Sequence, residues 1–444
     1  MGRCAVSTQK QKRPFALRAL AAFAGTLAIL FVLLLAAYAL PGERVRQHVY
    51  DSARTIQNEG LYPEYLGFKL FQMDNYTDTL MLFEAASADE LPPLQAMMTN
   101  TAYNVDNFET LADDLAWYIE KDWSTGAQRT DAPTLEPFSY ARYWHGYLIW
   151  LRPLLLLMPY TGVRIVQYIV LFALLAVVLV QLRRRCGLRA AMWFAVSQLA
   201  VSVWFVPHQV QYFTCFMIAY AGCAWVLAKP RRSDVLCLGL LVLGTATAFC
   251  DLLVTPIITL GLPLTCWLLE PQQRLRGGVP QCALAVGGSL CWGTGYALCW
   301  AGKWALAGAV TNNNVLADAL HQAEVRTTAD TWHGMELTWR NIFIFLYDAL
   351  NSHHLFWPAL AVLAVLIALF ILSIRSKTAL VRALPLALTT CMTPAWFVLL
   401  RTHSIQHGWF TWRALGLTVF AGLAFLYYAC DLRAARRRLQ KGSI

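Results

Sequence analysis

The chain has 444 residues, of which 58% are hydrophobic and only 14% are charged, and its formal net charge is +10. A soluble globular domain is about 45–50% apolar and about 25% charged, so this composition excludes an ordinary soluble domain and favours a protein with lipid as its solvent. Nucleic-acid binding is not expected either, because the positive charge lies in short clusters between apolar runs. The composition predicts an all-α, polytopic transmembrane bundle.

Apolar runs of the length that a membrane requires recur along the whole chain. A bilayer core of about 30 Å needs about 20 apolar residues per helix, and by that measure we expect about ten spans. The first run ends in a small-x-small pattern, Ala37-Tyr38-Ala39, but it is longer than the apolar core of a signal peptide and is expected to stay as a span. The expected spans are 15–40, 162–182, 190–207, 209–228, 234–250, 252–270, 280–301, 355–374, 379–400 and 411–430.

These spans divide the chain into five predicted units. One apolar segment, 143–159, is too short to cross, and a crossing there would reverse the sides of all later loops, so we expect it to lie at the membrane interface. The units are 1–40 (N-terminus and first span), 41–160 (a large, partly helical first loop with interfacial helices), 161–301 (spans two to seven), 302–354 (a second large loop) and 355–444 (the last three spans and a basic tail).

Lysine and arginine gather on one side of the predicted membrane. In this topology, the connections on the side of the N-terminus are rich in basic residues, whereas the opposite side is rich in acids. The positive-inside rule therefore predicts a multi-pass cell-membrane protein with both termini in the cytoplasm and both long loops outside. The basic connections contain Arg183, Arg184, Arg185, Arg189, Lys229, Arg231, Arg232, Arg274, Arg276, Arg375, Lys377 and Arg382.

The first outer loop carries two carboxylates with helical spacing. Asp74 and Asp78 are four residues apart, so they would share one face of a helix. Such a pair suits general-base work, because one carboxylate raises the pKa of the other, and it also suits a divalent cation such as Mg²⁺ or Mn²⁺. The competing interpretation is a solvated helix start that Asp74 caps.

The end of that loop combines basic side chains with aromatic ones. Arg142, Tyr143, His145 and Arg152 lie in a tyrosine- and tryptophan-rich stretch. Guanidinium groups match phosphate oxygens, and aromatic faces suit sugar rings, so an anionic headgroup site is one prediction. An aromatic belt with snorkelling arginines is the other.

The last outer loop has the highest density of candidate residues. Arg401, His403, His407 and Arg413 occur within thirteen positions, between two spans. The histidines lack the glutamate of a zinc signature, so phosphate or pyrophosphate binding is the better chemical match. Secondary candidates on the same side are His208, Asp251, Arg326 and His333.

Taken together, these features resemble the GT-C superfamily of membrane glycosyltransferases. The resemblance lies in the cytoplasmic N-terminus, a single span, a large outer loop with an acidic residue, and a bundle of further spans. It implies that a carboxylate in the first outer loop, Asp74 or else Asp78, is the general base. It also implies that basic residues of late loops hold a carrier phosphate, which matches Arg401, His403, His407 and Arg413.

The expected function is therefore inverting transfer of a sugar from a polyprenyl-phosphate-linked donor to an envelope glycan, lipid or protein acceptor. The other partners would be membrane lipids, with no nucleic acid. No metal is required if arginine and histidine supply the positive charge, and a divalent cation (Mg²⁺ or Mn²⁺) at the Asp74/Asp78 pair is left open. Two alternatives stay open: a transporter or flippase of lipid-linked saccharides, and a non-catalytic membrane protein of envelope assembly. The first predicts ionisable residues within the spans, and the second predicts tolerance of substitution at Asp74 and Arg401.

Overall fold

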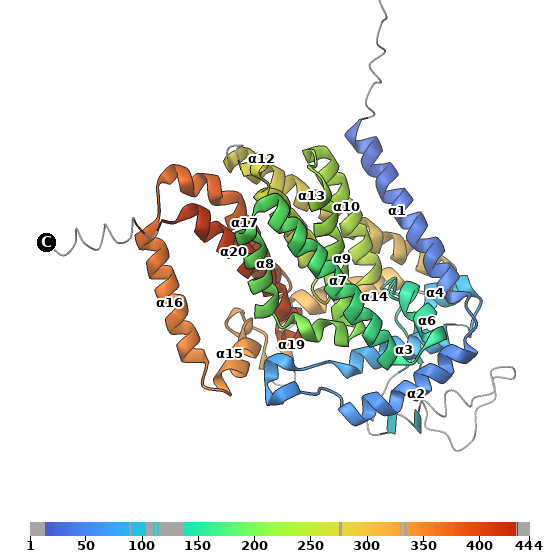
Figure 1. The fold of residues 1–444 in the computed structure, drawn as a ribbon. Coiled ribbons are helices and arrows are strands. Elements are labelled where there is room, and N and C mark those ends of the chain that lie inside the picture. Colours follow the sequence, from blue (N-terminus) through green and yellow to red (C-terminus); the bar gives the residue numbers. More distant parts are fainter. Residues whose placement is uncertain are drawn as a thin grey trace, which may run out of the picture.

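The chain folds as a bundle of apolar helices with smaller helices gathered at one end (Figure 1). The computed structural model describes residues 14–88, 90–103, 110–111, 113–114, 137–274, 278–328, 330–332, 335–431 and 433. Within these ranges, eight helices are long and apolar enough to cross a membrane. The predicted all-α, multi-pass class is thereby confirmed.

The long helices follow the predicted spans closely at most positions. Their bounds are α1 (Phe15–Tyr38), α7 (Tyr160–Cys186), α9 (Val210–Ala228), α10 (Ser233–Cys250), α13 (Gly278–Thr311), α16 (Phe356–Ser373), α17 (Lys377–Leu399) and α20 (Leu415–Ala429). The last of these is continuous with α19 (Gly408–Thr411) and the 3-10 turn Trp412–Ala414, so an apolar stretch from Gly408 to Ala429 is available.

Two expected spans fold as shorter helices, and one helix extends beyond its predicted span. The helices α8 (Leu188–Ala200) and α11 (Ile257–Leu269) have 13 residues each, which is only about 20 Å of helix against the roughly 30 Å of a bilayer core. In contrast, α13 continues ten residues past the predicted end at 301, to Thr311, because the Ala-rich sequence after Lys303 favours helix.

Most of the remaining elements lie together at the end of the bundle where α1 ends (Figure 1). From the first loop come α2 (Glu43–Glu59), α3 (Asn75–Ser87), α4 (Pro93–Thr99) and the two-stranded sheet β1 (Thr101–Tyr103) with β2 (Pro137–Ser139). The expected interfacial helix is α6 (Leu148–Leu157), which at 10 residues is too short to span. Later parts add α12 (Pro271–Arg274) at the other end of the bundle, and α14 (Val315–Thr328), β3 (Thr331–Trp332), β4 (Met335–Glu336), α15 (Ile344–Asn351) and α18 (Arg401–Gln406).

Glycine allows the two central helices to approach closely. The helix α10 packs along α13, and a Cβ at Gly244 would lie 2.1 Å from the carbonyl oxygen of Trp292. On the partner helix, a Cβ at Gly295 would lie 2.2 Å from the carbonyl oxygen of Leu241. Small residues at both contacts give backbone-to-backbone packing of the kind that holds helices together in lipid.

Side-chain contacts gather the basic connections at one end, which we call the basic end. The guanidinium of Arg18, near the start of α1, lies 2.8 Å from the Asp234 carboxylate at the start of α10. Likewise, Arg185 in the last turn of α7 lies 2.8 Å from Glu270, which follows α11. The N-terminal end of α1 and these connections therefore lie on one side, while α2, α3 and α4 lie at the other (Figure 1).

Candidate functional site

A cavity lined by aromatic rings lies at the end opposite the basic end. Its volume is about 130 Å³. Two guanidinium groups border it, and both approach one ring: the Cζ atoms of Arg142 and Arg326 lie 5.5 and 6.0 Å from the ring centre of Tyr143. We call this space the aromatic cavity; its principal lining residues are Arg142, Tyr143, Leu253, Tyr296, Trp300, Trp304, Arg326 and Trp396.

One wall of the aromatic cavity comes from a regular pattern on α13. Trp292, Tyr296, Trp300 and Trp304 are four residues apart, so they stand above one another on one helix face. Successive ring centres are 4.8, 4.9 and 6.0 Å apart. This ladder of rings presents aromatic faces of the sort that bind sugar rings or apolar chains. The sequence analysis missed the ladder, although its four-residue spacing is visible in the sequence.

Asp251 lies beside this wall, in the short connection between α10 and α11. Its Oδ2 accepts a hydrogen bond from the Val254 amide at 3.0 Å, which fixes the turn. Leu253 within the turn has a φ of 69°, in the left-handed region that branched residues rarely adopt. Burial raises the pKa of the Asp251 carboxyl to about 7, against the opposing effect of the Cys215 thiol and nearby amides.

The two histidines of the last outer loop meet at the same place. The rings of His403 and His407 lie 4.7 Å apart, and His407 stacks on Phe410 at 5.2 Å. His403 Nε2 lies 2.9 Å from the carbonyl oxygen of Leu253, so this nitrogen is the donor and Nδ1 is the acceptor of a neutral ring. Burial lowers the pKa of His403 well below its usual value, and that of His407 to about 4.

Several buried polar atoms around this point have no hydrogen-bond partner within the described ranges. Buried polar groups are nearly always paired, so such a cluster marks a place where water or a polar ligand completes the bonding. The atoms are Asp251 Oδ1, Tyr296 OH, Trp300 Nε1, His403 Nδ1, Ser404 Oγ and His407 Nδ1. Among the residues that the structure describes, no group of three or more His, Cys, Asp or Glu side chains could hold a metal ion.

The predicted carboxylate pair has helical spacing, but both members cap helices. Asp74 is the N-cap of α3: its Oδ1 accepts from the Thr77 amide at 3.0 Å. Its Oδ2 lies 3.3 Å from Trp409 Nε1, so the first and last outer loops touch here. Asp78 accepts from the Tyr160 hydroxyl and from the Val210 amide, at 3.3 Å, at the start of α9.

Both carboxylates have altered acidity as a result. Asp74 and Asp78 are fully enclosed, with 2% and 0% of their surfaces exposed. Burial raises the pKa of Asp74, and it raises that of Asp78 to about 7 despite the hydrogen bond from Tyr160. The neighbouring Asp74 charge also raises the pKa of Asp78, which is the coupling expected from the spacing.

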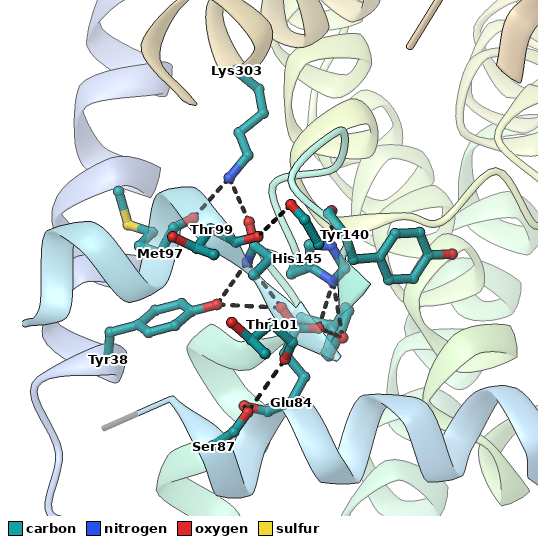
Figure 2. Close-up of polar contacts among 12 residues, drawn as sticks. Tyr38, Glu84, Ser87, Met97, Thr99, Thr101, Tyr140, His145 and Lys303 are labelled. Atoms are coloured by element: carbon teal, nitrogen blue, oxygen red, sulfur yellow. Dashed lines mark hydrogen bonds and ion pairs between the residues drawn. The ribbon is translucent and has the colours of Figure 1, made fainter. Parts of the chain in front are cut away.

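His145 lies inside a buried network (Figure 2). Its Nδ1 is 2.6 Å from Glu84 Oε2, and its Nε2 is 3.0 Å from the Tyr140 carbonyl oxygen. The ring therefore links the Glu84 side chain to the backbone of Tyr140. Asn100 Nδ2 donates to Glu84 at 2.9 Å, and Lys303 Nζ donates to Asn100 Oδ1 at 2.5 Å, so the network joins α3 to α13.

Three other predicted ligands also bind the protein itself. Arg152 is fully buried and donates to the carbonyl oxygens of Tyr38, at 3.3 Å, and Leu40, at 3.0 Å, which close the C-terminal end of α1. Arg413 donates to the Trp409 carbonyl oxygen at 2.7 Å. His208 Nε2 lies 2.9 Å from the Tyr65 hydroxyl.

The remaining predicted residues divide between the aromatic cavity and its surroundings. Arg142, Tyr143 and Arg326 line the cavity. Arg401 follows the lining residue Leu400, and its Cζ lies 5.5 Å from the Trp339 ring centre. His333 lies outside the described residues.

Comparison with protein-family models, curated proteins and solved structures finds no match for this chain. Its site must therefore be interpreted from its own geometry.

Proposed function

We propose that this chain is a membrane glycosyltransferase that takes a sugar from a polyprenyl-phosphate-linked donor at the end opposite the basic end. The observation that supports this most is the aromatic cavity, which combines a ladder of rings with two guanidinium groups beside buried, unpartnered polar atoms. Rings suit the sugar and the isoprenoid chain, and guanidinium groups suit the phosphate between them. The acceptor would be an envelope glycan, lipid or protein on the same side of the membrane.

The proposed reaction is a single displacement at the anomeric carbon. The acceptor oxygen forms the new glycosidic bond while the bond between the anomeric carbon and the phosphate oxygen breaks. The acceptor proton passes to a carboxylate, and polyprenyl phosphate leaves as the anion. Fixed cations stabilise the charge that develops on the leaving phosphate, which is commonly one of the largest catalytic terms. Arg142 and Arg326 are placed for that role because both line the cavity.

Asp251 is our first choice for the proton acceptor. Its Oδ1 has no donor within the described ranges, whereas both oxygens of Asp78 accept from the protein. Its carboxyl pKa of about 7 also suits a base that works near neutral pH. Asp74 is the second choice, because its Oδ2 faces Trp409 in the last outer loop.

Transport of lipid-linked saccharide is less well supported. A transporter would carry ionisable side chains in its spans that are available to substrate. The spans do contain buried Arg164 and Lys303, but Arg164 forms a two-point ion pair with Glu59, at 2.5 and 2.9 Å, and Lys303 donates to Met97 and Asn100. Both charges hold the outer segments against the bundle.

Turnover of defined donors tests the proposal. Full-length protein in lipid nanodiscs would receive a panel of polyprenyl-phosphate sugars with candidate acceptors, and mass spectrometry would follow release of polyprenyl phosphate. We expect one donor to be consumed, and Arg326→Ala to slow turnover by about 10²-fold or more, as when a fixed charge is removed from a developing anion. Arg184→Ala, which removes an exposed arginine at the basic end, is the matched control and should leave the rate unchanged.

The same assay separates the rivals. Loss of turnover in Asp251→Asn but not in Asp74→Asn would assign Asp251 as the base. The reverse result would assign Asp74 as the base. If no donor is consumed while labelled lipid crosses the bilayer of proteoliposomes, the chain is a flippase and the transferase proposal fails.

A further inference from the structure

A second groove lies at the basic end, far along the bundle from the aromatic cavity. It has a volume of about 370 Å³ and lies between the ends of α11, α13, α17 and α20. Three arginines line it, and none of its described lining residues is a carboxylate. We call it the arginine groove, after Arg274, Arg375 and Arg382.

Two of the arginines are held in place by the end of α20. Arg274 donates to the Tyr428 hydroxyl, and its Cζ lies 4.9 Å from the Tyr428 ring centre. Arg375 donates through Nε to the Cys430 carbonyl oxygen. Arg382 is exposed and has no hydrogen-bond or ion-pair partner among the described residues. The groove therefore offers positioned guanidinium groups that lack a protein anion, which suits a phosphate.

A buried amide gives an independent sign of a ligand. Gln281 lines the groove and is only 3% exposed. Its Nε2 donates to the Gln273 carbonyl oxygen at 3.0 Å, which fixes the orientation of the amide. Its Oε1 consequently points elsewhere and has no donor in the described structure. An unpaired buried acceptor calls for a hydroxyl or another donor from a bound molecule.

The surroundings of the groove favour a lipid over a soluble anion. Its inner part is apolar, with Leu268, Pro385 and Leu386 among the lining residues. Arg375 also borders another groove, between α16 and α20, with a volume of about 560 Å³. Its apolar part is lined by Leu366, Leu369, Phe370 and Leu426, and Asp431 and Arg433 line it beside Arg375. A phosphate at Arg375 would therefore stand at the head of an apolar channel that an acyl chain could occupy.

We propose that the arginine groove binds an anionic phospholipid with a hydroxylated headgroup, of the phosphatidylglycerol type, from the leaflet at the basic end. The phosphate lies among Arg274, Arg375 and Arg382, a headgroup hydroxyl donates to Gln281 Oε1, and an acyl chain follows the groove between α16 and α20. This assignment does not depend on the proposed catalytic function.

Native mass spectrometry of the delipidated full-length chain in detergent tests the assignment. The probes are dioctanoyl-phosphatidylglycerol, dioctanoyl-phosphatidylcholine and glycerol 1-phosphate. We expect one molecule of phosphatidylglycerol to bind, and Arg382→Ala to weaken its binding about tenfold, as for the loss of one charge-assisted hydrogen bond. Arg382→Ala breaks no contact within the described structure, so it should not impair folding. Arg184→Ala, at the same end but outside the groove, should bind as the wild type does.

Three results would overturn the assignment. Phosphatidylcholine carries the same phosphate but a quaternary ammonium in place of the glycerol headgroup, so its equal binding would show that neither net negative charge nor a headgroup hydroxyl is recognised. Equal weakening by Arg382→Ala and Arg184→Ala would show a diffuse electrostatic effect rather than a site. Binding of glycerol 1-phosphate as tight as that of the lipid would replace the lipid by a soluble phosphate. A rise in the thermal midpoint on addition of phosphatidylglycerol, smaller in Arg382→Ala, would support the site independently of the spectra.

Discussion

At the scale of single residues, Asp251 gives the clearest prediction. A base must be ionised, and burial raises the pKa of this carboxyl to about 7. A raised pKa means that the folded protein keeps a proton that the unfolded chain has already released, so this carboxyl lowers stability progressively as pH rises from 3.8 to about 7, while the active, ionised form is gained as pH passes about 7. We expect turnover to rise with pH through an apparent pKa near 7. Rate profiles of wild type and Asp74→Asn should share this limb, and a flat profile between pH 5 and 8 would exclude Asp251 as the base.

Single residues also show where sequence interpretation reaches its limit. The capping role considered for Asp74 is local, because the cap and its amide are three residues apart, and the structure contains it. Asp78 caps α9 more than 130 positions away, which no local pattern reveals. The same holds for His145, whose partner Glu84 lies in another helix. The sequence alone therefore does not distinguish an arginine that binds phosphate from one that donates to backbone carbonyl oxygens, as Arg152 does.

At the scale of elements, long uniform apolar runs predicted helices well, and mixed runs did not. The regular helix in the predicted span 190–207 ends at Ala200, just before Ser202, whose φ of 55° lies in the left-handed region, and the span continues into a 3-10 segment, Val203–His208. The predicted span 252–270 begins in the irregular turn at Asp251 and Pro256, which leaves α11 only 13 residues. The predicted span ends at 301, which leaves Lys303 in the second large loop, yet the helix continues through Lys303 to Thr311 and the Lys303 amine is buried against backbone carbonyl oxygens.

The contact between α10 and α13 is an element-scale feature that can be tested with two glycines of the same helix. A Cβ at Gly295 would lie 2.2 Å from the Leu241 carbonyl oxygen, whereas a Cβ at Gly287 would have nothing within 4 Å. Alanine is the better helix former by about 1 kcal/mol, so Gly287→Ala should keep or raise the thermal midpoint in detergent. Gly295→Ala should instead cost about 1–3 kcal/mol through overpacking. Equal midpoints for the two variants would show that the helices are not in close contact.

At the scale of the whole molecule, the orientation in the membrane determines which donors can reach the aromatic cavity. Arg184 is exposed at the basic end, and Asn313 is exposed in the connection after α13 at the opposite end. The positive-inside rule places Arg184 in the cytoplasm and Asn313 outside. With the unmodified chain as the background control, an impermeant maleimide should label Asn313→Cys in intact cells and Arg184→Cys only after permeabilisation.

The opposite labelling pattern would change the chemistry as well as the topology. A cytoplasmic aromatic cavity would have access to soluble activated sugars, so a lipid-linked donor would no longer be required. The arginine groove would then face the outer leaflet, and its proposed ligand would have to come from there. With the expected pattern, the proposed sugar transfer would take place outside, at the aromatic cavity, and the proposed phospholipid would bind from the cytoplasmic leaflet, among the three arginines of the arginine groove.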